Sequence, residues 1–300
     1  MNRGTIAYNQ MRGEAGSIPL CKLLSAKDGE IQMMEMRIRT AALAAVVAGL
    51  AIPVLVHAQG TGSQPGAGTA APEAAPLMGA SWHPNNEYWR HHDQLLLTDF
   101  GWLARFKDED TKLGPPAAGE NRVVFMGDSI TEGWPLDKSF PGKPYVNRGI
   151  SGQTTPQMLV RFYADVVALH PRIVHILAGT NDVAGNTGPN SPQDFMNNIR
   201  AMTDLARANG IKVLIGSIPP SSHLSWRPEV TPGPRIAELN AWLERFAAER
   251  HAIYVDYHAA LAAPDGSMRA DLTHDGVHPH RAGYALMRPL AESAIAQALR

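Results

Sequence analysis

The sequence predicts an α/β protein built on a parallel sheet, and two observations lead to that class. From residue 121 onward, short apolar runs alternate with longer amphipathic stretches, as expected of strands that are each followed by a helix. Pro171 and Gly210 stand at two joints between a helical stretch and the next apolar run. A sheet of this kind carries helices on both faces.

The elements follow one another in regular alternation, without an internal repeat. Strands are expected near 122–127, 145–149, 172–178, 211–217 and 252–256. Helices are expected at 153–169, 192–209, 232–250 and 281–298. Gly210 is a typical residue to end the second helix. Together these elements predict one domain over residues 119–300.

Residues 82–118 precede this domain and are rich in aromatic residues and leucine. An apolar stripe recurs at helical spacing, which predicts a helix over about 90–112: Leu95-Leu96-Leu97, Phe100, Leu103 and Phe106. We expect its apolar stripe to pack on the core of the domain; a ligand groove is the alternative role. Residues 59–81 are a Gly/Ala/Pro-rich stretch with too little apolar bulk to fold, so we expect a flexible linker there.

Residues 36–58 have the pattern of a secretory signal peptide. A basic start at Met36-Arg37-Ile38-Arg39 is followed by an apolar run and the small-residue exit Val56-His57-Ala58. Cleavage after Ala58 would make the protein secreted or periplasmic, and a retained N-terminal membrane anchor is the alternative. Residues 1–35 contain acidic side chains that do not suit a signal peptide, so we interpret them as an upstream extension that the native precursor lacks.

Composition excludes several classes of function. The chain of 300 residues has a net charge of -1, and it shows no dense basic stripe of the kind that binds nucleic acid. It also lacks a P-loop and a G-x-G-x-x-G motif, so phosphate and dinucleotide binding have no support. We expect neither a metal nor an organic cofactor. The sequence does not predict the oligomeric state.

Four motifs place candidate site residues after predicted strands. Gly127-Asp128-Ser129 follows the first strand, Gly152 lies in the loop after the second, and Gly179-Thr180-Asn181-Asp182 follows the third. Asp275 and His278 share a loop beyond the fifth strand. Because the carboxyl ends of parallel strands meet at one edge of the sheet, we expect these residues to converge there.

These residue types suit acyl transfer. A serine hydroxyl such as that of Ser129 is a weak nucleophile until a base takes its proton, and His278 is a suitable base. Asp275 is placed to accept a hydrogen bond from the far imidazole nitrogen and orient the ring. The backbone N–H groups of Ser129 and Gly152 and the side-chain amide of Asn181 are the expected donors to a tetrahedral oxyanion.

At these positions the sequence resembles the SGNH hydrolases, the superfamily that contains the GDSL esterases and lipases. Its four name-giving residues match Ser129, Gly152, Asn181 and His278, in that order, over about residues 120 to 300. Ile130 stands where the GDSL motif has leucine. The resemblance implies a flavodoxin-like three-layer α/β/α sandwich with a five-stranded parallel sheet in the order 2-1-3-4-5. It also implies a serine esterase that forms an acyl-enzyme, with a small-molecule or glycan ester as its partner.

The substrate is less defined, because the family includes lysophospholipases, other lipid acylhydrolases, thioesterases and carbohydrate O-acetyl esterases. The chain shows no obvious lid or large apolar insertion, which favours a short acyl group such as acetate on a sugar or cell-wall polymer. We expect Trp134, His223 and Trp226 to line the cleft, although packing is an equally good role for Trp226. A noncatalytic glycan- or lipid-binding module with the same fold is the alternative of another class.

Structural interpretations compete at several of these residues. Ser129 also suits a helix N-cap, and Asp182 is better interpreted as part of an Asx turn that closes the third strand than as a reactive group. His175, inside the third strand, is expected to be a buried core residue. The cluster His274, Asp275, His278 and His280 contains ligand types that bind transition metals, but it lacks a helical H-x-x-x-H face and would leave Ser129 unexplained.

Overall fold

The computed structural model describes residues 86–300. Its core is a five-stranded, all-parallel sheet in the order β2-β1-β3-β4-β5. The strands are β1 (Val123–Gly127), β2 (Tyr145–Gly149), β3 (Ile173–Leu177), β4 (Lys212–Gly216) and β5 (Ile253–Val255). The predicted fold class, strand order and five strand positions are confirmed.

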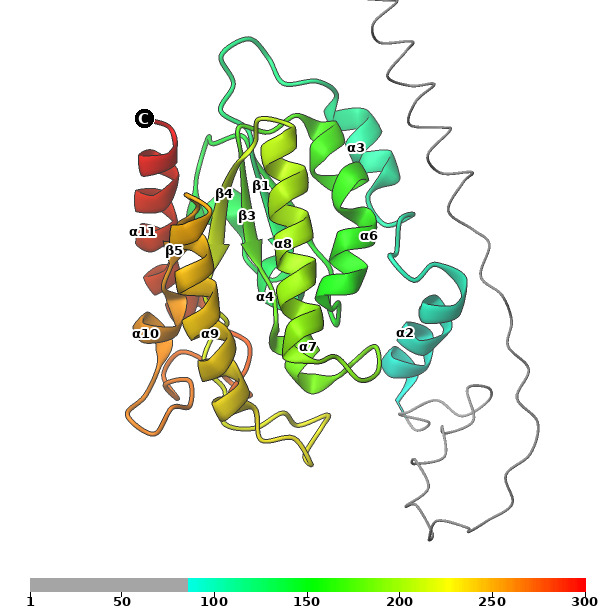
Figure 1. Cartoon of the computed structure of the whole chain (residues 1–300), viewed down its shortest axis with the longest axis vertical. Coiled ribbons are helices and arrows are strands. Elements are labelled where there is room, and N and C mark those ends of the chain that lie inside the picture. Colours follow the sequence, from blue (N-terminus) through cyan, green and yellow to red (C-terminus); the bar gives the residue numbers. More distant parts are fainter. Residues whose placement is uncertain (1–85) are drawn as a thin grey trace, which may run out of the picture. The chain divides into compact units, whose positions relative to one another are not determined.

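Helices cover both faces of the sheet, because alternate apolar residues of a strand point to opposite faces and both faces must be buried. The helices α6 (Thr155–Asp165), α8 (Pro192–Ala208) and α9 (Pro232–Glu249) lie together in front of the strands in Figure 1. Val124 and Met126 of β1 belong to the apolar cluster on that side, whereas Val123 and Phe125 belong to the cluster on the opposite face.

The opposite face is covered by helices that differ widely in length. They are α4 (Ser129–Glu132), α5 (Leu136–Ser139), α10 (Tyr257–Leu261) and α11 (Arg281–Ala298). A further short helix, α7 (Thr180–Ala184), follows β3. Periodicity does not predict helices of four or five residues, because they are too short to repeat a hydrophobic pattern.

The four long helices match the prediction except at one end. Helix α6 stops at Asp165, and a 3₁₀ turn over Val167–Leu169 completes the segment that was expected to be helical. Helix α8 begins with a capping box between Ser191 and Asp194, and Gly210 follows its end with φ of +71°.

The single helix predicted over 90–112 is wrong, because the chain forms two helices there. They are α2 (Glu87–Thr98) and α3 (Lys107–Leu113). Between them the carboxylate of Asp99 accepts the N–H groups of Leu103 (2.9 Å) and Ala104 (3.1 Å), so the backbone turns instead of continuing the helix.

The apolar stripe expected on that helix is also not core. Leu97, Phe100 and Leu103 expose 79%, 38% and 45% of their surface, and within the stripe only Phe106 is buried. The break at Asp99 ends the helical repeat, so the later residues of the stripe do not continue the face of α2.

Within residues 86–300, no helix combines the length and the apolar character that crossing a membrane requires. The predictions for residues 1–35, 36–58 and 59–81 concern segments outside the described residues.

Candidate active site

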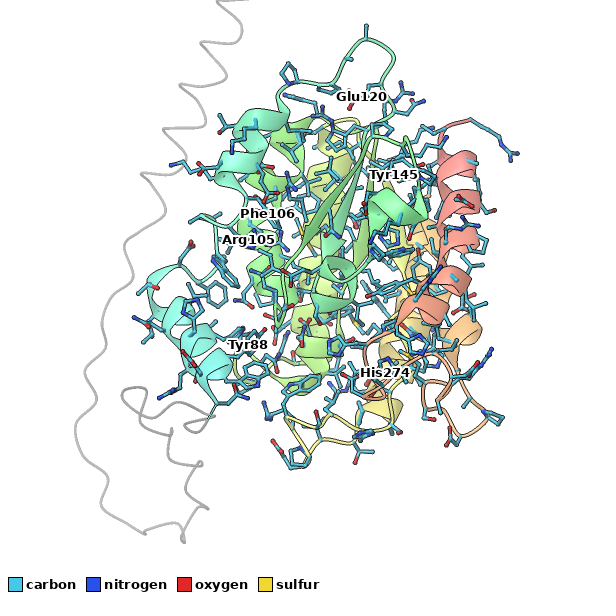
Figure 2. The ribbon with its side chains drawn as sticks, turned by 180° about the vertical axis from the view of Figure 1, so that it is seen from behind. Tyr88, Arg105, Phe106, Glu120, Tyr145 and His274 are labelled. Atoms are coloured by element: carbon cyan, nitrogen blue, oxygen red, sulfur yellow. The ribbon has the colours of Figure 1, made fainter. Side chains whose placement is uncertain are left out.

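The predicted site residues meet at the carboxyl edge of the sheet. Figure 2 shows Glu120 and Tyr145, which lie near the starts of β1 and β2, at the upper end of the molecule. Tyr88 of α2 and His274 of the loop before α11 lie toward the lower end, where the strands finish. Helix α2 and the loop that carries His274 therefore flank the same edge.

Ser129 is the first residue of α4, directly after β1. The N-cap of this helix is Asp128, whose side chain accepts the N–H of Ile130 at 2.9 Å, so the capping role belongs to Asp128. The hydroxyl oxygen of Ser129 lies 2.9 Å from Nε2 of His278. Burial raises the pKa of Asp128 to about 7, although the N–H of Ile130 opposes that rise.

The far side of the imidazole is held by Asp275. Nδ1 of His278 lies 2.6 Å from one carboxylate oxygen of Asp275, and the other oxygen accepts the N–H groups of Val277 (3.0 Å) and His278 (2.8 Å). Partial burial alone would raise the pKa of Asp275, but the hydrogen bonds from His278 and Val277 outweigh it and hold the pKa at about 2. The carboxylate is thus ionised over the range in which a histidine acts as a base.

Gly152 and Asn181 lie beside Ser129. Gly152 has φ of +79°, and a Cβ there would lie 3.1 Å from the ring of His92 and 3.3 Å from the hydroxyl oxygen of Tyr88. Both the backbone conformation and the close approach of α2 therefore require glycine. The amide of Asn181 donates one N–H to the carbonyl of Gln153 at 3.1 Å. An amide carries two N–H groups, and among the described residues the second has no acceptor.

Asn186 is a site residue that the sequence did not reveal. Its amide donates to the side-chain oxygen of Asn181 (2.9 Å) and to the carbonyl of Gly152 (3.2 Å), and its own oxygen accepts the indole N–H of Trp226 (3.0 Å). The bond from Asn186 fixes the orientation of the Asn181 amide. The only signal in the sequence is the Gly185-Asn186-Thr187-Gly188 turn that follows the third motif.

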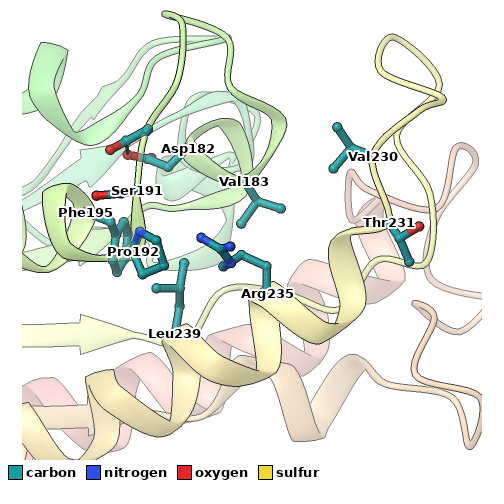
Figure 3. Close-up of a pocket in the computed structure, with 10 residues that line it drawn as sticks. Asp182, Val183, Ser191, Pro192, Phe195, Val230, Thr231, Arg235 and Leu239 are labelled. Carbon is teal, nitrogen blue, oxygen red and sulfur yellow. Dashed lines mark hydrogen bonds between the residues drawn. The ribbon is translucent and has the colours of Figure 1, made fainter. Parts of the chain in front are cut away.

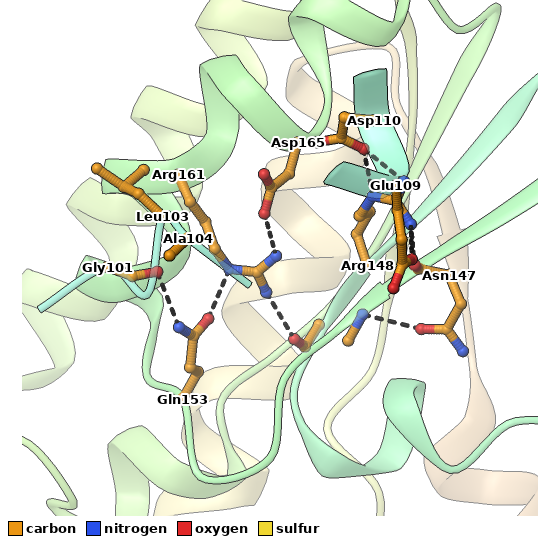
Figure 4. A network of polar contacts seen from close by, with 12 residues as sticks. Gly101, Leu103, Ala104, Glu109, Asp110, Asn147, Arg148, Gln153, Arg161 and Asp165 are labelled. Carbon is orange, nitrogen blue, oxygen red and sulfur yellow. Dashed lines mark hydrogen bonds and ion pairs between the residues drawn. The ribbon is translucent and has the colours of Figure 1, made fainter. Parts of the chain in front are cut away.

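A buried network of hydrogen bonds and ion pairs connects the same loops (Figure 4). The guanidinium of Arg161 donates to the carbonyl of Gly127 (3.0 Å), to the side chain of Gln153 (2.6 Å) and to Asp165 (2.9 Å). Gln153 in turn donates to the carbonyl of Gly101 at 3.1 Å. Arg161 therefore joins the end of β1 to the loop that carries Gly152.

Ser129 opens into a pocket of about 240 Å³. Its lining residues come from α2, from the segments that follow β1, β2 and β3, and from the loops before α9 and α11. They are Tyr88, Trp89, Ser129, Ser151, Gly152, Asn181, Trp226 and His278. The arrangement can deprotonate a nucleophile and stabilise an oxyanion in one small space.

The three residues expected in the cleft have different positions. Trp226 lines the pocket. His223 is exposed and lies against the turn at Gly276, beside Asp275 but outside the pocket. The prediction for Trp134 is wrong: the residue is 1% exposed and packs against Phe125 in the core, where its indole N–H donates to the hydroxyl of Ser139.

The other competing interpretations also have an outcome. His175 is fully buried, lies 2.8 Å from the hydroxyl of Tyr257, and has a pKa that burial lowers to about 3, so its core role is confirmed. Asp182 has a structural role but makes no Asx turn: it accepts hydrogen bonds from Thr155 and Asn190 and so joins the loops after β2 and β3. Within residues 86–300, no group of acidic, histidine or cysteine side chains is arranged to hold a metal.

A second cavity of about 240 Å³ lies between α7, α8 and α9 (Figure 3). Arg235 and Leu239 of α9 face Pro192 and Phe195 of α8 across it, and Asp182 borders it. It contains neither Ser129 nor His278, so it is separate from the site described above.

Fold and site together define a class of protein, the three-layer α/β hydrolases with Ser, Gly, Asn and His at the carboxyl edge of a 2-1-3-4-5 sheet. The chain belongs to the GDSL-like lipase/acylhydrolase family, whose sequence model matches residues 125–286. A GDSL-like lipase from Bacteroides thetaiotaomicron is 40% identical and superposes with a TM-score of 0.64 over 67% of this chain and 100% of its own. A structure from Bacteroides fragilis, also 40% identical, gives a TM-score of 0.66 over 67% of this chain and 99% of its own.

Curated relatives are more distant. An acetylxylan esterase from Xylanibacter ruminicola is 26% identical over 245 residues, which are 69% of this chain but 48% of that protein. The chain therefore spans about half the length of this relative. Esterase TesA from Pseudomonas aeruginosa is 30% identical over 180 residues, 54% of this chain and 81% of the esterase.

Proposed function

We propose that the protein is a serine esterase that hydrolyses carboxylic esters through an acyl-enzyme. One observation carries the proposal: a continuous line of hydrogen-bond distances runs from Ser129 Oγ through His278 to Asp275, at 2.9 Å and 2.6 Å, beside Gly152 and Asn181. A binding module needs no such line, because binding does not require proton transfer.

The reaction takes two steps that use the same groups. Ser129 Oγ attacks the ester carbonyl while Nε2 of His278 takes its proton, and the N–H groups of Ser129, Gly152 and Asn181 stabilise the oxyanion. The alcohol then leaves with the proton from His278, and the acyl group remains on Ser129. A water molecule, deprotonated by His278, attacks the acyl-enzyme; collapse returns the proton to Ser129 and releases the carboxylic acid.

The pocket favours a short acyl group. Its volume of about 240 Å³ is below the range of about 300–1,000 Å³ that holds drug-sized ligands. Among the described residues, no Leu, Ile, Val or Met lines it, so a long acyl chain would find no aliphatic surface beside Ser129. This favours acetyl esters over lysophospholipids and other lipid substrates.

Hydrolysis of p-nitrophenyl acetate, butyrate and decanoate by the full chain tests the proposal, with Ser129→Ala as the control. We expect activity on acetate that falls with chain length and disappears in Ser129→Ala. Activity that survives Ser129→Ala would disprove the serine mechanism. Binding of esters without turnover would favour the noncatalytic module instead.

We also propose that the protein is exported, on the signal-peptide pattern of residues 36–58. N-terminal sequencing of the form outside the cytoplasm tests this. A mature start at Gln59 is expected; an intact signal segment in a membrane fraction would support the anchored alternative.

A further inference from the structure

Two tryptophans from distant parts of the chain form one aromatic surface in the pocket. Trp89 of α2 and Trp226 of the loop before α9 are stacked, with ring centroids 6.4 Å apart and planes inclined by 27°. Both line the pocket that contains Ser129, and Tyr88 lines it beside them. We call Tyr88, Trp89 and Trp226 the aromatic wall.

Trp89 and Tyr88 come from a segment outside residues 125–286, the part matched by the family model. The structure nevertheless fixes this segment to the catalytic loops. Gln157 and Gln153 donate from the start of α6 and its preceding loop to the carbonyls of Phe100 (2.8 Å) and Gly101 (3.1 Å), just after α2. Gly152 provides the space for α2 to approach, because any side chain there would meet His92 and Tyr88. The wall is therefore a built part of the site.

The composition of the pocket indicates what the wall binds. Its apolar surface is aromatic, and its remaining lining is polar, with Ser129, Ser151, Asn181 and His278. A pyranose ring has faces of C–H groups, which pack on aromatic rings, and an edge of hydroxyl groups, which need polar partners. An alkyl chain packs best on aliphatic side chains, and among the described residues no Leu, Ile, Val or Met lines this pocket.

We propose that the aromatic wall is the binding subsite for a sugar ring, so that the alcohol of the natural ester is an O-acylated carbohydrate. This inference rests on the proposed esterase function and adds the class of its alcohol. Hydrogen bonds also connect the wall to the expected oxyanion donors. The indole N–H of Trp226 donates to Asn186, whose amide donates to the side-chain oxygen of Asn181 and to the carbonyl of Gly152. A sugar on the wall is thus placed at a fixed position relative to the oxyanion donors.

Two acetyl esters that differ only in their alcohol test the inference on the full chain. One is a mono-O-acetylated methyl β-xylopyranoside, and the other is ethyl acetate, whose alcohol is too small to cover the wall. For Trp89→Ala and Trp226→Ala, we expect kcat/KM on the sugar ester to fall about tenfold further than on ethyl acetate, mainly through KM.

Matched variants separate this from general damage to the site. Trp226→Phe keeps an aromatic face but loses the bond to Asn186, so it should retain most of the preference for the sugar ester. Trp102→Ala removes a tryptophan from the same N-terminal segment but outside the pocket, and should leave the ratio of the two kcat/KM values unchanged. Equal losses on both esters in Trp89→Ala and Trp226→Ala would overturn the inference while leaving the esterase function intact.

A binding measurement addresses the case in which no ester is cleaved, which would count against the proposed function itself. Saturation-transfer NMR with methyl β-xylopyranoside and the Ser129→Ala protein reports on the wall alone. A signal that is lost in Ser129→Ala/Trp89→Ala supports the subsite, and the absence of any signal in Ser129→Ala overturns it.

Discussion

The side-chain amide of Asn186 donates to the side-chain oxygen of Asn181 over 2.9 Å. Because an amide oxygen and nitrogen point in opposite directions, this bond fixes the orientation of the Asn181 amide. In the proposed mechanism Asn181 has its oxygen held by Asn186 and one N–H held by the carbonyl of Gln153, and keeps its other N–H for the oxyanion. Asn186 is therefore a positioning residue.

Asn181→Ala removes an oxyanion donor and should lower kcat about 10²–10³-fold. Asn186→Ala leaves the donor present but removes one of the two bonds that orient its amide, so we expect a smaller fall of roughly tenfold, in kcat and not in KM. Steady-state kinetics on p-nitrophenyl acetate measure both. Asn190→Ala, which removes a bond to Asp182 in the same loop, is the control. A change confined to KM in Asn186→Ala would contradict the positioning role.

Ser129→Ala and His278→Ala should each lower kcat by at least about 10⁴-fold, and Asp275→Asn by up to about that factor, by analogy with serine proteases. The double variant Ser129→Ala/His278→Ala should be hardly worse than either single variant, because the two groups act as a unit. The neighbouring His274→Ala should change kcat little, and circular dichroism checks that each variant folds. Additive losses in the double variant would show that the residues act independently.

Removal of metal ions should not reduce activity, because a protein side chain supplies both the nucleophile and the base in the proposed mechanism. Activity on p-nitrophenyl acetate before and after dialysis against EDTA is the measurement. A loss that zinc or manganese restores would favour the metal interpretation of the cluster at His274, Asp275, His278 and His280.

Asp165→Ala should reduce the free energy of unfolding by about 3–5 kcal/mol, because it leaves the buried guanidinium of Arg161 without its carboxylate. The double variant Arg161→Met/Asp165→Leu removes both charges and should be less destabilised than Asp165→Ala. Urea unfolding followed by tryptophan fluorescence compares the three proteins. The idea fails if the double variant is the least stable.

His175 should make the fold sensitive to acid. Burial lowers its pKa to about 3, so between about pH 6.5 and 3 the unfolded chain binds a proton that the folded protein does not. The free energy of unfolding therefore falls with decreasing pH in this window, by about 1.4 kcal/mol per pH unit from this residue. Burial raises the pKa values of Asp128 and Asp182, so these two carboxyl groups change the free energy of unfolding with pH in the opposite direction. Their contribution is the same in wild type and in a variant that lacks only His175.

His175→Gln isolates the histidine, because glutamine has no proton to gain and can still bond to the hydroxyl of Tyr257. Urea unfolding at pH 4, 5, 6 and 7 should give a stability difference between wild type and His175→Gln that changes with pH. Parallel curves would show that His175 is not the acid-sensitive group.

The sequence by itself determined the fold class and the candidate site residues. Alternating apolar and amphipathic runs specify a parallel sheet, and Ser129, Gly152, Asn181, Asp275 and His278 stand directly after its strands or in the last loop, where topology brings them to one edge. These features are local in the chain, so a single sequence displays them.

Only the tertiary structure decided the roles of Trp134, Trp89 and Asn186. Trp134 was expected in the cleft and lies in the core, whereas Trp89, from a segment expected to pack on the core, lines the pocket. Asn186 acts on a neighbour through a side-chain bond that no spacing rule encodes. The physical reason is the same in each case: the direction of a side chain outside a regular long helix or strand depends on the distant residues packed around it, and periodicity carries no information about those contacts.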